Sequence, residues 1–219
     1  SRIELIGDDD ARWTVSDQGA SAVLLKMDAF QGRLGTPGAL MRKGTQAESS
    51  VPPALPVPVV QLGKPVPTRP ADTALAASPA LRAALAAVTS ADDCEALGPG
   101  GSLSPDSEPE ALTVQRLSAD KLLVSLSCWR AAYNTGDGYW VINDRAPYQP
   151  RLVTTAAVGD EVRTIQEAHK GRGLGDCWSS TAWGWTGTQF VKTSSTGLCR
   201  LVAAGGAWEM PTLVTTVRE

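Results

Sequence analysis

Residues 121–128 of the chain read Lys-Leu-Leu-Val-Ser-Leu-Ser-Cys. From Leu122 to Cys128 every second side chain is apolar, and Ser125 and Ser127 lie between them. Because successive side chains of an extended chain point to opposite faces, this period of two places the apolar side chains on one face. The stretch therefore predicts a β-strand that turns one face toward a core.

The same alternation recurs around this strand, in short runs separated by turns rich in glycine and aspartate. The turns are expected at 118–120, 134–138, 159–160, 186–187 and 205–206. The runs are 112–117, 139–142, 151–158, 161–168, 183–185, 189–192, 199–202, 207–210 and 213–217. Short turns between alternating runs are typical of hairpins. We predict a mainly β (α+β) fold, an antiparallel meander of about eight to ten strands with one or two short helices.

One helix is expected directly before this meander. Ser78-Pro79 combines a good N-cap with proline at the first helical position. Leu81, Leu85 and Val88 then form one apolar stripe, and Cys94 follows in the loop. We therefore place a short helix after Ser78.

An earlier helix is expected after Asp17, which is also a good N-cap, and Gly32 and Gly35 are expected to end it. Its apolar residues recur at helical spacing and predict a core-facing stripe of Val23, Met27, Phe30 and Leu34. The opposite, solvated face is expected to carry Asp28, Gln31 and Arg33.

Proline is concentrated between Gln46 and Asp72, with seven prolines in that span. Proline fixes φ and removes amide donors, so this segment is expected to be an extended, semi-rigid spacer. Valine and leucine alternate with the prolines, and we expect the spacer to lie against a neighbouring surface. The predicted organisation is the end of an N-terminal strand-and-helix unit at 1–45, a proline-rich linker at 46–75 and a disulfide-bonded antiparallel β domain at 76–219.

The overall composition excludes several classes of protein. The 219 residues suffice for one or two domains, and 20 basic and 23 acidic residues are well mixed, so no nucleic-acid partner is expected. No apolar run approaches the roughly 20 residues that cross a bilayer, so no transmembrane segment is expected. The chain begins at Ser1 without a signal-peptide pattern, so either an export signal was removed or the chain is a fragment.

The four cysteines are Cys94, Cys128, Cys177 and Cys199, and none forms a Cys-x-x-Cys pair. A zinc ribbon or a thioredoxin-type redox site is therefore not expected. Either the cysteines form disulfides in an exported protein, or they are buried free thiols in a cytosolic one. We predict disulfides, with Cys94 paired to Cys128 and Cys177 paired to Cys199, and a periplasmic or secreted location.

Several stretches of the chain resemble the bacterial family catalogued as domain of unknown function 1176. They are 24–33 (Leu-Leu-Lys-Met-Asp-Ala-Phe-Gln-Gly-Arg), 128–134, 170–177, 183–190 and Cys199-Arg200, and the Gly-Arg-Gly-x-Gly-Asp-Cys signature at 171–177 is specific. The resemblance implies an exported periplasmic protein with six cysteines, the first two in an N-terminal segment that this chain lacks. It implies disulfides and no reaction. Trp178 departs from the family, which commonly has glycine there.

The glycine-rich stretch that carries this signature is also where catalysis would be sought. His169 lies beside Glu167, Lys170 and Arg172, and an envelope hydrolase with a site around His169, Arg172 and Asp176 is the alternative function. A single histidine excludes a multi-histidine metal site, and we expect no metal and no cofactor. The glycine spacing does not fit a dinucleotide-binding fingerprint, so it predicts a tight turn that brings Cys177 to its partner.

The aromatic residues suggest binding more than catalysis. Trp and Tyr are typical anchors of partner surfaces, although in a small β domain most of them are expected in the core. The predicted ligand or partner surface comprises Trp178, Trp183, Trp185, Trp140, Tyr133 and Arg172. Because no catalytic motif is recognisable, we favour a non-enzymatic binding protein for an unknown envelope protein or glycan. A purely structural envelope component is a further possibility.

We predict that Arg172 and Asp176 hold the glycine turn and that His169 is dispensable. Asp176→Ala should lower stability by about 1–3 kcal/mol because buried turn groups lose a partner. His169→Ala should leave melting temperature and partner retention nearly unchanged. The hydrolase hypothesis predicts the reverse, with both variants folded and inactive, so melting curves and binding assays of the two variants separate the two hypotheses.

Overall fold

The fold is described from a computed structural model. It describes residues 3–6, 12–15, 24–25, 27–41, 56–103, 108–161, 163–173, 175, 177–196 and 211–219. The chain divides into two compact units, 1–55 and 56–219. The strands expected at 199–202 and 207–210 and the turn at 205–206 lie outside the described residues. Within the described ranges, no helix is long and apolar enough to cross a membrane.

In the first unit, β1 (Ile3–Ile6) and β2 (Arg12–Val15) form an antiparallel hairpin, and residues 27–30 are helical. Asp28 is fully buried, and its carboxylate accepts hydrogen bonds from the Leu40 and Met41 amides, each at 2.9 Å. Burial raises the pKa of Asp28, but these amides and Arg33, whose Nε lies 3.3 Å away, outweigh it and lower the pKa below its ordinary value.

The prediction for the faces of this helix was therefore wrong at three positions. Asp28 was expected in solvent and is buried, whereas Phe30 and Leu34 were expected in the core and are 88% and 52% exposed. The reason is the length of the helix, which gives way to turns after Phe30. The chain then returns to place two backbone amides on the Asp28 carboxylate, a contact between residues too far apart for helical spacing to reveal.

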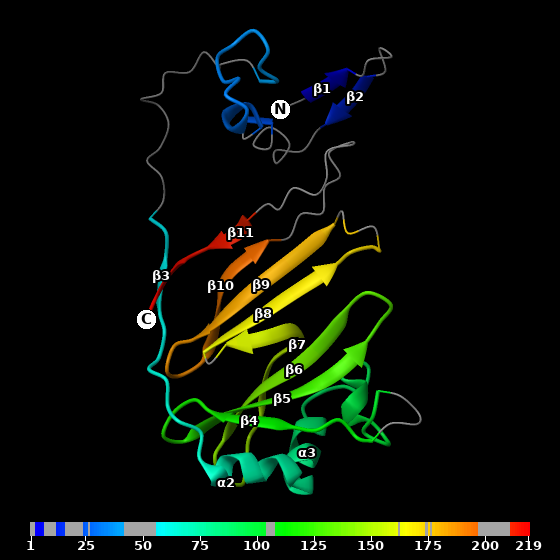
Figure 1. Ribbon diagram of the computed structural model, residues 1–219, viewed down its shortest axis with the longest axis vertical. Helices are drawn as coiled ribbons and strands as arrows, with labels where there is room; N and C mark the ends of the chain where they lie inside the picture. Colours follow the sequence, from blue (N-terminus) through cyan, green and yellow to red (C-terminus); the bar gives the residue numbers. More distant parts are fainter. Residues whose placement is uncertain are drawn as a thin grey trace. The chain divides into compact units, whose positions relative to one another are not determined.

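The second unit is built on an eight-stranded antiparallel sheet in the order β11-β10-β9-β8-β7-β6-β5-β4. The strands are β4 (Thr113–Arg116), β5 (Lys121–Arg130), β6 (Thr135–Asn143), β7 (Arg151–Glu161), β8 (Thr164–Lys170), β9 (Trp178–Trp185), β10 (Phe190–Thr196) and β11 (Pro211–Val214). Each strand lies beside the one before it in the sequence, as Figure 1 shows. The predicted mainly β, antiparallel meander is thus confirmed.

Two of the predicted turns are instead parts of strands. Residues 135–138 belong to β6, and 159–160 belong to β7. Tryptophan side chains pack against the backbone of β6 at Gly136 and Gly138, and glycine leaves room for them. A Cβ on Gly136 would collide with the Trp129 ring, and one on Gly138 would lie 2.5 Å from Cys128 Sγ and closer still to the Trp140 ring. These glycines therefore make room for indoles and do not turn the chain.

Short helices cover one face of the sheet beside β4 and β5 (Figure 1). They are α2 (Pro70–Thr73), η2 (Ala74–Ala77), α3 (Pro79–Ala86) and η3 (Glu95–Leu97). Ser78 Oγ accepts a hydrogen bond from the Leu81 amide, as predicted for the N-cap, but α3 ends at Ala86 and Val88 is 46% exposed. The core here consists of Leu81, Leu85, Cys94, Ala96, Leu112, Val114, Leu122, Val124, Leu126, Cys128, Trp140 and Ile142.

The Cys94–Cys128 disulfide joins the loop after α3 to β5, which confirms that predicted pair. Both cysteines are fully buried in the core beneath the helices. Cys177 is also disulfide-bonded. Its predicted partner, Cys199, lies outside the described residues, so the second pairing stays a prediction.

The other face of the sheet is concave and has a core of its own. It consists of Leu117, Leu123, Tyr139, Ala157, Ile165 and Trp185. Gln115 on β4 donates to Asp160 on β7 at 3.1 Å, although these strands are three steps apart and neighbouring strands lie about 4.8 Å apart. The sheet must therefore curl, and register shifts in the β5–β6, β6–β7, β7–β8 and β9–β10 pairs supply the bends.

The described portion of the proline-rich segment is attached to the sheet through its backbone. β3 (Val59–Gln61) pairs in parallel with β12 (Thr216–Arg218). Leu62 is buried, and the Gly63 amide donates to the Trp185 carbonyl at 2.8 Å. Val57 and Val59 remain about half exposed, so the attachment depends on backbone pairing and Leu62 more than on the valines.

A buried arginine links the helical layer to the sheet. Arg116, at the end of β4, is 4% exposed and forms an ion pair with Asp72 of α2 and another, at 3.4 Å, with Asp144. Its Nη1 also donates to the Ser118 and Ala119 carbonyls. The hydrogen bond from Arg116 lowers the pKa of Asp72 and outweighs the opposing effect of burial.

We predict that Gly138→Ala destabilises the protein and that Gly159→Ala does not. The first substitution forces a Cβ into the Trp140 ring and the disulfide, which should cost about 3 kcal/mol as over-packing. Gly159 is also in a strand, but nothing lies within 4 Å of its added Cβ. Denaturant unfolding of both variants measures the difference, and equal stability would contradict the proposed role of Gly138.

We also predict acid destabilisation through Asp72. Because its pKa is lower in the folded state, its contribution to stability is present above the unfolded pKa of about 3.9 and is lost as the pH falls through the folded value. Asp72→Asn should therefore be less stable at pH 7, by roughly 3 kcal/mol for a broken buried pair. It should also lose less stability than the wild type on acidification below about pH 5. Parallel pH profiles in the two proteins would refute this role.

Candidate functional site

Two of the tryptophans predicted for a partner surface lie in the interior. Trp140 and Trp185 are each 0% exposed. Trp140 Nε1 donates to Thr89 Oγ1 at 2.9 Å within the core under the helices, and Trp185 packs against Phe190 on the concave face. Neither can contact a partner, which corrects those two positions of the predicted surface. Their burial fits the expectation that most aromatics belong to the core.

Trp178 and Trp183 are half-buried but do not form one patch. They are five residues apart on β9, whose pairing with β8 has no register shift between them, so they point to opposite faces. Lys170 lies over the Trp178 ring at 5.1 Å, and Lys192 lies over the Trp183 ring at 5.0 Å. Trp183 Nε1 donates to Glu167 Oε1 at 2.9 Å, so the Trp183 ring is fixed on the concave face.

The glycine turn between β8 and β9 is held by backbone hydrogen bonds. The Gly171 amide donates to the Cys177 carbonyl at 2.8 Å, and the Gly175 amide donates to the Arg172 carbonyl at 3.1 Å. Gly175 has a positive φ of 69°, as a tight turn requires. Arg172 is exposed, and Asp176 lies outside the described residues. The proposed anchoring of the turn by these two side chains stays a prediction.

His169 is exposed, and its Nε2 lies 3.5 Å from Asn134 Nδ2. Asn134 mainly binds the backbone of Lys170, donating to its carbonyl and accepting from its amide, each at 2.9 Å. Tyr133, next to Asn134, is 48% exposed. Among the described residues, no cluster of three or more His, Cys, Asp or Glu side chains could hold a metal ion.

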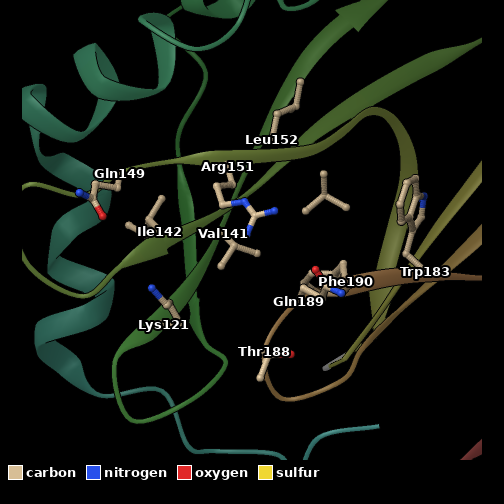
Figure 2. Close-up of a pocket in the computed structure, with 11 residues that line it drawn as sticks. Lys121, Val141, Ile142, Gln149, Arg151, Leu152, Trp183, Thr188, Gln189 and Phe190 are labelled. Carbon is tan, nitrogen blue, oxygen red and sulfur yellow. The ribbon is translucent and has the colours of Figure 1, made fainter. Parts of the chain in front are cut away.

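The structure places a cavity of about 230 Å³ elsewhere, where the concave face opens. Figure 2 shows Lys121 and Gln149 at one side, Val141 and Arg151 in the middle, and Trp183 and Phe190 at the other side. The full lining is Lys121, Val141, Ile142, Gln149, Arg151, Leu152, Val153, Trp183, Thr188, Gln189 and Phe190. β6 and β10 are four strands apart, so only the curl of the sheet brings these side chains together.

Local structure positions the polar side chains of this cavity. Lys121 pairs with Asn143 across β5 and β6, and Lys121 Nζ donates to Asn143 Oδ1 at 2.5 Å. The side-chain nitrogen of Asn143, Nδ2, in turn donates to Gln149 Oε1 at 3.1 Å. Gln149 adopts a positive φ of 46°. Arg151 lies opposite Val141 on the neighbouring strand. The cavity therefore combines a fixed polar side with an apolar floor.

Of the predicted surface, only Trp183 lines this cavity; the other lining residues were not singled out. A signal for two of them is present in the sequence, because Lys121 and Arg151 occupy the first positions of long alternating runs. Lys121 shares a strand face with Leu123, two residues further on, and Arg151 shares a face with Val153 in the same way. What the alternation could not show is that the β9–β10 hairpin covers them.

Comparison with known proteins gives a family and no activity. The family model described as "Protein of unknown function (DUF1176)" matches residues 1–215. The "Uncharacterized protein YpfG" of Escherichia coli (strain K12) is 29% identical over 230 residues, which cover 94% of this chain and 61% of that protein. The chain thus spans about three fifths of that relative. No solved structure matches. Because the family model matches almost the whole chain, the chain belongs to the family of unknown function DUF1176.

Proposed function

We propose that this chain is an exported, non-enzymatic binding protein that holds its ligand in the cavity of the concave face. The observation that carries the proposal is the composition of that cavity. Apolar side chains such as Val141, Trp183 and Phe190 line it together with a few fixed polar groups. This combination is typical of small-ligand sites in curled β-sheets.

Binding is favoured over catalysis because the described lining of the cavity holds no paired base and nucleophile. It has no His, Asp, Glu, Cys or Ser side chain. Lys121 and Thr188 could react, but their described side-chain partners are Asn143 and Thr186, neither of which is a general base. His169, the centre of the alternative hydrolase site, is exposed, and its described polar contact is Asn134. The partner classes predicted from the sequence, an envelope protein or a glycan, stay predictions, and the cavity supports a small ligand.

The Cys94–Cys128 disulfide supports an exported location. Disulfides form and persist in the periplasm and outside the cell, whereas cytosolic thiols are kept reduced. Both cysteines lie in the core that joins the helices to the sheet, and their bond cross-links this core. We infer a periplasmic or secreted protein.

We predict that filling the cavity abolishes ligand retention. Val141→Phe adds an aromatic ring to the floor of the cavity, and strands tolerate aromatic residues well. The matched control is Val158→Phe on β7, where the valine is 48% exposed and outside the cavity. Equilibrium dialysis against a deproteinised envelope extract, followed by mass spectrometry, should show a compound that the wild type and Val158→Phe retain and Val141→Phe loses. Equal retention by Val141→Phe, or none by the wild type, would sink the proposal.

A further inference from the structure

We propose that the ligand is an aromatic carboxylate whose acid group binds Arg151 and Lys121 and whose ring packs against Val141, Trp183 and Phe190. This inference rests on the proposed function and adds the chemical class of the ligand. The first observation is the charge of the side chains that line the cavity. The cavity has two cationic side chains and no acidic one in its lining, in a chain of net charge −3.

Arg151 is an exposed arginine without a described ion pair, and it lines the cavity. Arg130 and Arg145 also lack a described ion pair, but they do not line it. Among the described residues, Arg116 pairs with Asp72, Arg33 with Asp28 and Arg163 with Glu219. Within the same ranges of the chain, no carboxylate lies within ion-pair distance of Arg151, and its guanidinium has no described hydrogen-bond acceptor. A guanidinium presents a planar fork of donors that matches a carboxylate in two parallel hydrogen bonds.

Lys121 adds a second positive charge and is held in place. Its ammonium donates to Asn143 Oδ1, which is neutral, so two of its three donors remain for an anion. Lys121 lies on β5 and Arg151 on β7, on either side of β6, at the same end of the sheet. Two cationic side chains at one cavity favour an anion over a cation. Arg151 is exposed, so solvent and salt weaken this preference.

The apolar portion of the ligand follows from the other walls. Trp183 is fixed by its hydrogen bond to Glu167, and Phe190 packs against Trp185 with ring centroids 5.4 Å apart. Rigid aromatic walls favour a flat, apolar group. A cavity of about 230 Å³ lies below the 300–1,000 Å³ typical of drug-sized ligands, so it suits one or two fused rings.

The test uses two probes of the same shape, the anion 2-naphthoate and the neutral 2-naphthamide. Their affinities for the full chain are measured by ligand-observed NMR titration. Naphthoate should bind about tenfold more tightly, because a charge-assisted pair of hydrogen bonds replaces neutral ones. Added salt should weaken naphthoate binding and leave naphthamide binding unchanged.

The variants assign this difference to the cavity. Arg151→Gln and Lys121→Gln should each lower naphthoate affinity toward that of naphthamide without changing naphthamide binding. Arg145→Gln is the matched control, since Arg145 is an exposed arginine in the β6–β7 loop and does not line the cavity. Its naphthoate affinity should equal that of the wild type.

Two outcomes would overturn the inference. If both probes bind with equal affinity and Arg151→Gln changes neither affinity, the cavity binds apolar groups regardless of their charge. The inference about the carboxylate is then wrong, and the proposed function stands. If neither probe binds, the ligand class is wrong. In that case, an extract compound lost only by Val141→Phe would still support the proposed function. If no such compound is found, both the ligand class and the proposed function are wrong.

Discussion

The second unit depends on the buried guanidinium of Arg116. From the end of β4 it binds groups of α2, the β4–β5 turn and the β6–β7 loop. The Arg116 amide adds a further bond, donating to Thr68 Oγ1 just before α2. A buried charge is tolerated only when its donors are satisfied, so these segments must all be in place together. The position of the helical layer on the sheet is therefore specified by polar geometry as well as by apolar packing.

The β-sheet could be predicted from the sequence and the cavity could not, because alternation reports faces and does not report curvature. Alternation along 121–128 reports which side chains share a face, and the four predicted for the core of β5 are all buried. Strand order followed from the short turns. Alternation carries no information about curvature, however, and the cavity exists only because the sheet bends until β10 reaches β6. The register shifts that produce this bend have no clear signature in a single sequence.

Glycine and aspartate predicted local structure least reliably, because each residue type occurs in several structural settings. Gly136 and Gly138 were interpreted as turn residues, yet they lie within β6 where indoles cross the strand. Asp28 was placed in solvent by helical spacing, yet it binds two distant amides. In both cases the residue type alone does not show which side chain or backbone amide the residue meets. The tryptophans show the same limit, since residue type alone does not separate the buried Trp140 and Trp185 from the half-buried Trp178 and Trp183.

The parallel pairing of β3 with β12 has a mechanical consequence. The two strands run in the same direction, so tension applied between the residues before β3 and those after β12 pulls the strands past each other along their length. In that geometry the inter-strand hydrogen bonds bear the load together, whereas an antiparallel hairpin pulled from its open end would break its hydrogen bonds in succession. β3 and β12 thus form a shear clamp that shields the meander from forces transmitted along the chain.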